Sequence, residues 1–193
     1  MSSDKSDIRE LIVVAASNIF NKYGFRKATM DEIARSMGKG KSSIYYYFTS
    51  KEEIYEAVIE REAELLRHEV IRSISQAEDP KEKLRNYVLT RMKTFRRVSN
   101  FYFAIRTEVV NHLDSIDRIR KKYDREEIHL LQDILEEGVN KKVFRVEDTE
   151  LTAIAIVTAL KGLEIPLFWS DKRRNPEGQM ENLLNVLFYG IMK

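Results

Sequence analysis

The segment from 29 to 53, TMDEIARSMGKGKSSIYYYFTSKEE, constrains the fold of this chain more than any other. Thr29 and Glu32 have the spacing of a capping box, in which both side chains bond to backbone N–H groups at the start of a helix. A Gly-Lys-Gly sequence at 38–40 then permits a tight backbone turn. The segment therefore predicts two short helices joined by a tight turn, with a third helix beginning soon after.

Further helix-start patterns occur along the chain. Ser50 and Glu53 repeat the capping-box spacing at the head of a long helix, and Asp-Pro at 79–80 and Asn-Pro at 175–176 place a capping residue before a first-turn proline. Apolar residues recur with the helical period in almost every long segment. We therefore expect later helices at roughly 80–98, 101–113, 117–141, 149–168 and 177–192. Three prolines and seven glycines in 193 residues complete the pattern of an all-α protein.

The first helix is expected to bury one face and to end at Gly24, a residue type that favours helix C-termini. The apolar residues assigned to that face are Ile8, Leu11, Ile12, Ala15, Ile19 and Phe20.

Composition excludes several classes of protein. Cysteine is absent, so there are no disulfides, thiolate metal sites or catalytic cysteines. The N-terminus lacks the pattern of a signal peptide, and no apolar run is long enough to span a bilayer, so we expect a cytoplasmic protein. The three histidines are scattered, and no hydrolase or phosphate-loop motif is present. We expect no metal, no cofactor and no enzymatic activity.

Positive charge is concentrated near the N-terminus. Residues 22–51 contain seven Lys or Arg and two acidic residues, a local charge of +5, whereas the whole chain has a net charge of +2. Neutralisation of phosphates supplies most non-specific DNA affinity. The charge distribution therefore favours a nucleic-acid partner for this segment, although a solvated basic face is the alternative explanation.

The second short helix is expected to bury one face and expose the other. Ile44 and Phe48 are four residues apart and should point inward, whereas Tyr47 should be partly buried. Residues expected on the outer surface are Lys41, Ser42, Ser43, Tyr45 and Tyr46. Such side chains can donate to bases and phosphates when a helix-turn-helix places its second helix in the major groove. A DNA-binding regulator is therefore the leading interpretation.

The segment resembles the signature of the TetR family, the tetracycline-repressor type of bacterial regulator. That signature reads T-x-x-x-I-A-x-x-x-G, a short turn, a recognition helix ending Y-x-x-F, and then S-K-E. The matching residues are Thr29, Ile33, Ala34, Gly38, Ile44, Tyr45, Tyr46, Tyr47, Phe48, Ser50, Lys51 and Glu52, and the preceding helix ends F-x-x-x-G-F at 20–25.

The resemblance implies an all-helical homodimer in which a three-helix helix-turn-helix domain precedes a helical bundle for ligand binding and dimerisation. It implies DNA contacts from the recognition helix, from Thr29 and from Lys51, which would bind a phosphate. The full set of predicted DNA contacts is Thr29, Lys39, Lys41, Ser42, Ser43, Tyr45, Tyr46, Tyr47 and Lys51. The turn departs from the family pattern, which has Val-Ser-x-Gly at 39–42 and often His at position 47. We therefore do not infer the base preferences of this chain from those of its relatives.

Two features of the later chain indicate partners. Residues 153–160, AIAIVTAL, are apolar nearly all round, so two faces must be covered. One can pack on the domain core, and a partner subunit is the simplest candidate to cover the other. Gly162 would permit close approach there or mark a kink. The resemblance also implies an effector pocket for a partly apolar small molecule, for which an ordinary core is the alternative. The candidate ligand-binding residues are Tyr87, Phe95, Phe103, Arg106, His112 and Leu131.

These observations predict a DNA-binding domain at 1–50 and an effector-binding and dimerisation domain at 51–193. The expected function is that of a ligand-responsive repressor, released by its effector from a pseudo-palindromic double-stranded DNA operator. Two alternatives remain from other classes. One is a helical protein-interaction module with a vestigial helix-turn-helix, and the other is a cofactor-independent helical enzyme.

Overall fold

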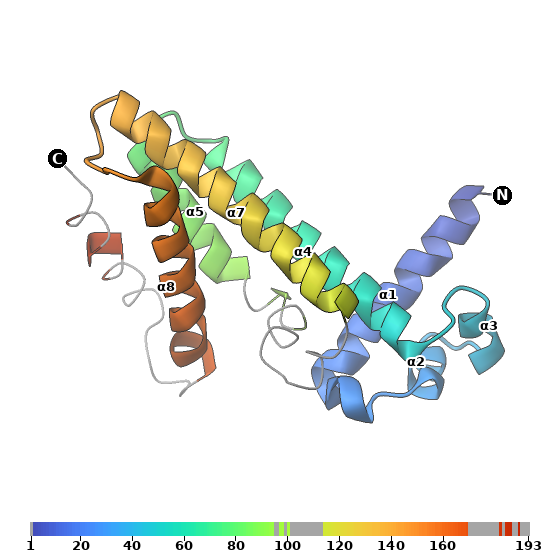
Figure 1. The fold of residues 1–193 in the computed structure, drawn as a ribbon. Helices are drawn as coiled ribbons and strands as arrows, with labels where there is room; N and C mark the ends of the chain where they lie inside the picture. Colours follow the sequence, from blue (N-terminus) through green and yellow to red (C-terminus); the bar gives the residue numbers. More distant parts are fainter. Residues whose placement is uncertain are drawn as a thin grey trace. The chain divides into compact units, whose positions relative to one another are not determined.

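The structure is a computed structural model, and it describes residues 2–94, 97, 98, 100, 114–169, 182, 184–186 and 189. Figure 1 shows its helices. They are α1 (Ser2–Lys27), α2 (Met30–Ser36), α3 (Lys41–Tyr45), α4 (Lys51–Ile74), α5 (Pro80–Thr94), α7 (Asp114–Asn140) and α8 (Thr149–Trp169). The all-α prediction is confirmed over these residues. The helices expected at 101–113 and, for the most part, 177–192 lie outside the described residues.

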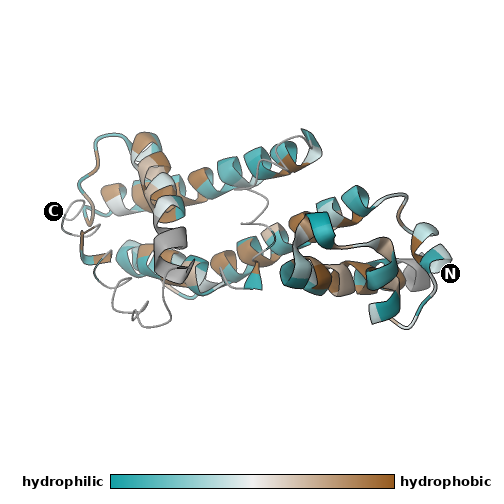
Figure 2. Ribbon diagram, turned by 90° about the horizontal axis from the view of Figure 1, so that it is seen from below, coloured by the Kyte–Doolittle hydropathy of each residue, from teal (hydrophilic) through white to brown (hydrophobic). Residues whose placement is uncertain are grey.

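The chain divides into two compact units. The N-terminal unit comprises residues 1–65 and 97–120, and the C-terminal unit comprises residues 66–96 and 121–193. Helices α4 and α7 each contribute residues to both units. Figure 2 shows hydrophobic and hydrophilic residues alternating around the helices, which is the pattern of amphipathic helices that pack on one face. Within the described ranges, none of these helices combines the length and the apolar run that a bilayer crossing needs.

The core of the N-terminal unit forms around aromatic residues of α1 and α4. The ring of Tyr55 meets the edge of Phe20 at a centroid distance of 5.0 Å and lies 4.6 Å from the ring of Phe25. Phe25 reaches this position because α1 bends at Gly24, whose φ of 75° and ψ of 159° fall in a region almost restricted to glycine. The expected break at Gly24 is therefore a bend, and the short turn after it is helical.

The buried face of α1 differs slightly from the expected one. Ile12, Ala16 and Phe20 are buried together with Val13, whereas Leu11 is exposed. The assignment of Leu11 to the buried face was wrong. Successive side chains point about 100° apart, so Ile12, Val13, Ala16 and Phe20 lie within one arc of about 100° around the helix, and Leu11 lies about 100° outside it.

The C-terminal unit is built from the end of α4, from α5, from most of α7 and from α8, and apolar stripes of these helices are buried. The stripe of α8 comprises Ala153, Ile156, Val157 and Leu160, all of which are buried. Helix α5 begins as predicted, because the Asp79 carboxylate accepts a hydrogen bond from the N–H of Lys81 at 2.8 Å. The Phe144 ring packs directly against the backbone of Gly138, where a Cβ atom would lie 2.0 Å from the ring. A glycine at that position thus allows the chain to fold back after α7.

Candidate nucleic-acid interface

Helix α2 begins with the predicted capping box. The Thr29 hydroxyl accepts a hydrogen bond from the Glu32 N–H at 3.2 Å, and the Glu32 carboxylate accepts one from the Thr29 N–H at 2.9 Å. Helix α2 then ends in a turn at Gly38, which has a φ of 64°. A positive φ is readily adopted only by glycine. This turn sets the direction in which the chain enters α3.

Helix α3 and the three residues that follow it divide their side chains between the core and solvent. Ile44 and Phe48 are 1% and 0% exposed, whereas Tyr45 and Tyr46 are 46% and 68% exposed. Tyr47 is half-buried and meets the ring of Tyr46 edge-on at 4.9 Å. The predicted burial of Ile44 and Phe48 is therefore confirmed, and the two outer tyrosines present their rings and hydroxyl groups at the surface.

The basic and hydroxyl residues of the turn and of α3 lie on the same short stretch of surface. Lys39, Lys41, Ser42 and Ser43 are all exposed. The Lys41 ammonium lies 3.3 Å from the Asp31 carboxylate, and both side chains are about half exposed. The N-terminal unit thus carries a compact set of hydrogen-bond donors, one of which, the Lys41 ammonium, pairs with the Asp31 carboxylate.

Lys51, which was predicted to bind a phosphate, makes structural contacts in the N-terminal unit. Its ammonium donates to the carbonyl oxygens of Phe25 at 2.8 Å and Ala28 at 3.0 Å. It also lies 4.5 Å from the centre of the Phe25 ring. Lys51 therefore ties the first turn of α4 to the end of α1, and uses two of the three N–H donors of its ammonium group.

Replacing Lys51 with Met should destabilise the protein. The substitution keeps most of the aliphatic stem but removes two hydrogen bonds and a cation–π contact, so we expect a loss of about 1–3 kcal/mol in the free energy of unfolding. Chemical denaturation followed by circular dichroism measures this loss. Lys39→Met is the matched control, because Lys39 is exposed and should leave stability unchanged. Equal stability of both variants and the wild type would refute the structural role.

The start of α4 follows the predicted pattern only in part. The Ser50 hydroxyl accepts a hydrogen bond from the Glu53 N–H at 3.1 Å, as expected for a cap. The Glu53 carboxylate, however, accepts from the backbone N–H of Thr49 at 2.7 Å rather than from Ser50. The expected reciprocal bond is therefore shifted by one residue, and the same carboxylate also accepts a hydrogen bond from the Thr49 hydroxyl at 2.8 Å.

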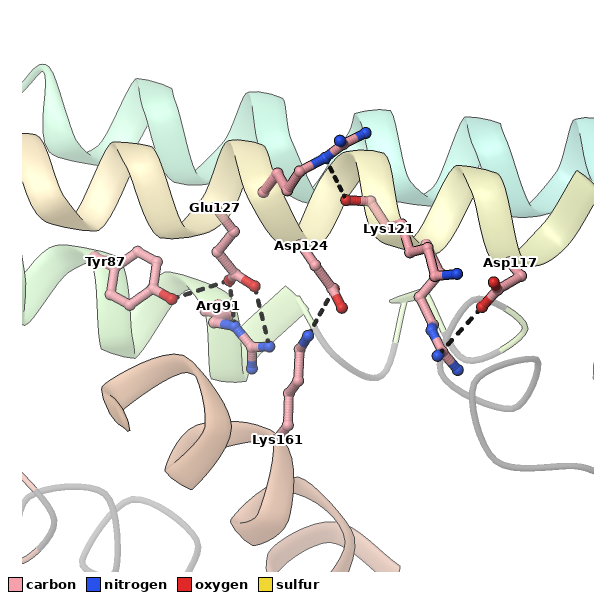
Figure 3. Close-up of polar contacts among 9 residues, drawn as sticks. Tyr87, Arg91, Asp117, Lys121, Asp124, Glu127 and Lys161 are labelled. Carbon is pink, nitrogen blue, oxygen red and sulfur yellow. Dashed lines mark hydrogen bonds and ion pairs between the residues drawn. The ribbon is translucent and has the colours of Figure 1, made fainter. Parts of the chain in front are cut away.

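The C-terminal unit contains a partly buried charge network, shown in Figure 3. The Arg91 side chain of α5 is buried and forms an ion pair with Glu127 of α7 at 2.5 Å. Tyr87 donates its hydroxyl to the same carboxylate at 3.0 Å. Lys161 of α8 pairs with Asp124 of α7 at 2.6 Å. The network thus joins α5, α7 and α8 within one unit.

The electrostatics of Glu127 result from two opposing effects. Burial raises the pKa of its carboxyl group, but the charge and hydrogen bonds of Arg91, the charge of Lys161 and the Tyr87 hydroxyl together lower it. The net result is a pKa below the ordinary value of a glutamate. Glu127 is therefore ionised at neutral pH and balances the buried guanidinium.

Two of the predicted ligand-binding residues lie in this network or beside it. Tyr87 and Leu131 are both fully buried, Tyr87 on α5 and Leu131 one turn after Glu127 on α7. The other four lie outside the described residues: Phe95, Phe103, Arg106 and His112. The sequence interpretation missed Arg91 and Glu127. Both occupy positions in an otherwise apolar helical stripe, which is the signal that could have identified them.

Helix α8 has an exposed face opposite its buried stripe. Leu151 and Ile154 are 63% and 39% exposed. The small residues on the same face are also exposed, namely Ala155, Thr158, Ala159 and Gly162. Among the described residues, no group of three or more His, Asp or Glu side chains is arranged to hold a metal ion.

Comparison with known proteins relates both halves of the chain to one family. The family model of the bacterial regulatory proteins of the tetR family matches residues 12–58, and that of a tetracyclin repressor-like C-terminal domain matches residues 77–164. The first match covers the capping box, the turn and α3. The second covers α5, all of α7 and the buried stripe of α8.

Individual relatives agree with these matches. YhgD, an uncharacterized HTH-type transcriptional regulator of Bacillus subtilis, is 24% identical over 97% of this chain and 96% of its own. NicS, a transcriptional repressor of Pseudomonas putida, is 28% identical over 71% of this chain and 66% of its own. The crystal structure of a transcriptional regulator from Cytophaga hutchinsonii has a TM-score of 0.76 at 26% identity, over 95% of this chain and 98% of that one. With a glycine turn, an outward-facing α3 and both family regions in place, this chain belongs to the TetR family of bacterial transcriptional regulators.

Proposed function

We propose that this regulator is a repressor that binds a pseudo-palindromic operator as a homodimer and is released by a small-molecule effector. The observation that carries the DNA-binding part is the exposed surface of α3 and of the residues just after it. Tyr45 and Tyr46 are exposed beside the turn lysines, while Ile44 and Phe48 pack in the core. Arrangements of this kind let the second helix of a helix-turn-helix reach base edges and phosphates.

The proposed DNA contacts are those expected from the sequence. Lys39, Lys41, Ser42, Ser43, Tyr45, Tyr46 and Tyr47 contact the operator from the turn and α3, and Thr29 does so from the start of α2. Lys51 has one further N–H donor for a phosphate beyond its two structural bonds. Selection of genomic fragments with the purified protein would identify the operator. Failure to enrich any fragment over a protein-free control would contradict the proposal.

We assign DNA binding to residues 1–50 and effector binding and dimerisation to residues 51–193, in a cytoplasmic protein. This functional division differs from the compact units, because the first part of α4 packs with α1 through Tyr55. The proposed effector site uses Tyr87 and Leu131 together with Phe95, Phe103, Arg106 and His112. Ligand pockets are mostly apolar with a few polar groups, and the Arg91–Glu127 pair among apolar side chains of α5 and α7 supports that assignment.

The effector proposal can be tested on the selected operator. A library of amphipathic small molecules is screened for compounds that raise the thermal unfolding temperature of the protein and also dissociate it from operator DNA. A ligand can shift this equilibrium only through different affinities for the DNA-bound and released states. Compounds that stabilise the protein without changing operator affinity would argue against an effector role.

The exposed face of α8 supports dimerisation. Replacing Ile154 with Glu puts a charge in the middle of this face, and we expect the protein to become monomeric at micromolar concentration because a buried unpaired charge opposes association. Multi-angle light scattering measures the mass. The matched control is Ile71→Glu, since Ile71 on α4 is exposed to nearly the same extent, 38% against 39%. A monomeric wild type, or a dimeric Ile154→Glu variant, would refute this interface.

A further inference from the structure

Asp31, whose side chain is about half exposed, lies beside the residues of the proposed DNA-binding surface. It belongs to the first turn of α2, and its carboxylate is 3.3 Å from the Lys41 ammonium at the start of α3. The cap of α2 is formed by Thr29 and Glu32, so the Asp31 side chain is not needed for it. Asp31 therefore presents a negative charge beside a lysine that is expected to bind DNA.

Lys41 is the first residue of α3, and its ammonium carries a positive charge that pairs with an anion. In the free protein the anion near Lys41 is the Asp31 carboxylate, and in a DNA complex it would be a phosphate. Exposed ion pairs of this kind contribute only about 0–1 kcal/mol. The pair is therefore weak, but its carboxylate competes with a phosphate for Lys41 and repels the DNA backbone.

We propose that Asp31 reduces the affinity of this protein for DNA by holding Lys41 in an intramolecular ion pair, and that it thereby limits non-specific binding. The inference rests on the proposed DNA-binding function. Non-specific affinity depends almost entirely on the number of phosphates neutralised. Withholding one lysine from the phosphates therefore lowers non-specific affinity by a larger proportion than operator affinity, because an operator complex also gains base contacts from the tyrosines.

The experiment compares full-length wild type and Asp31→Asn on a fluorescein-labelled random-sequence duplex. Fluorescence anisotropy gives the affinity at a series of salt concentrations from about 50 to 200 mM. We expect Asp31→Asn to bind about three- to tenfold more tightly at the lowest salt, with a slope of log K against log[salt] that is steeper by about 0.9, the value for one more neutralised phosphate. A change confined to folding would leave this slope unaltered.

Two further variants make the test specific. Asp133→Asn alters the net charge by the same amount at an exposed position of α7 in the C-terminal unit, and it should bind like the wild type. In a Lys41→Ala background, Asp31→Asn should no longer steepen the slope. If the wild type binds DNA but Asp31→Asn shows no gain, or a gain equal to that of Asp133→Asn, the inference fails and the proposed function stands. If the wild type binds neither this duplex nor any genomic fragment, both fail.

Discussion

Replacing Tyr45 and Tyr46 together with Ala is expected to lower operator affinity by about a hundredfold or more, because each side chain contributes contacts of about 1–3 kcal/mol in interfaces of this type. Both tyrosines are exposed, so the core of the N-terminal unit does not depend on their full side chains. The thermal unfolding temperature should therefore change little while binding is lost. Titration of the selected operator at fixed salt measures the effect.

The tyrosine prediction has a matched control in the same unit. Tyr23 lies on α1 outside the helix-turn-helix and is 41% exposed, close to the 46% of Tyr45. Tyr23→Ala should retain operator affinity within about threefold, since surface substitutions away from contacts have small effects. Wild-type affinity in the double Tyr45→Ala, Tyr46→Ala variant would show that α3 is not the recognition helix.

Replacing Glu127 with Ala is expected to cost about 3–5 kcal/mol in the free energy of unfolding, because it leaves the buried Arg91 guanidinium without the carboxylate that balances it. A loss of this size is a large part of the total stability of a small protein. Urea denaturation measures it. The neighbouring residue is the control, since Glu126 pairs with Arg67 at 3.2 Å and both of these side chains are well exposed.

Glu126→Ala should cost less than about 1 kcal/mol, as exposed ion pairs do. The double variant Arg91→Met, Glu127→Leu should recover most of the loss caused by Glu127→Ala, because apolar groups of similar volume can replace a buried pair. Equal losses for Glu126→Ala and Glu127→Ala would mean that the charge network does not hold α5 against α7.

The Glu127 carboxylate should also affect how the free energy of unfolding decreases at acidic pH. Its pKa is lowered in the folded protein, so the folded state binds its proton less readily than the unfolded chain does. The contribution of Glu127 is therefore complete above the unfolded pKa of about 4.3 and is lost as the pH falls through the lower, folded value. Between about pH 7 and pH 3, Glu127→Gln should lose less stability than the wild type. If the wild type and Glu127→Gln lost the same amount of stability over this pH range, the result would contradict this account.

Local sequence patterns predicted the structure of the helix-turn-helix well. The capping box, the glycine turn and the burial of Ile44 and Phe48 depend on residues within a few positions of one another, and helix period and cap chemistry determine them directly. Lys51 was harder to interpret, since its two carbonyl partners lie 26 and 23 residues earlier. No spacing rule relates these positions before the bend at Gly24 is known.

Long-range pairing explains why the charge network was missed. Arg91 and Glu127 are 36 residues apart, and each on its own looks like an ordinary charged residue of a soluble helix. Each, however, lies in register with an apolar stripe, Arg91 beside Val88 and Met92, and Glu127 one turn before Leu131. A charge in such a register predicts burial, and burial of one charge predicts an opposite charge elsewhere. The pairing itself requires the tertiary fold.

If the exposed apolar face of α8 is the dimer interface that we propose, the amount of protein in the cell would itself influence regulation. If that face is covered by a second copy, every folded dimer is stabilised by mass action, so the unfolding temperature rises with concentration. Dilution would then reduce both the fraction of assembled repressor and the resistance of the remaining chains to unfolding and proteolysis. The amount of regulator that a cell maintains would act as an input to the promoter alongside the effector.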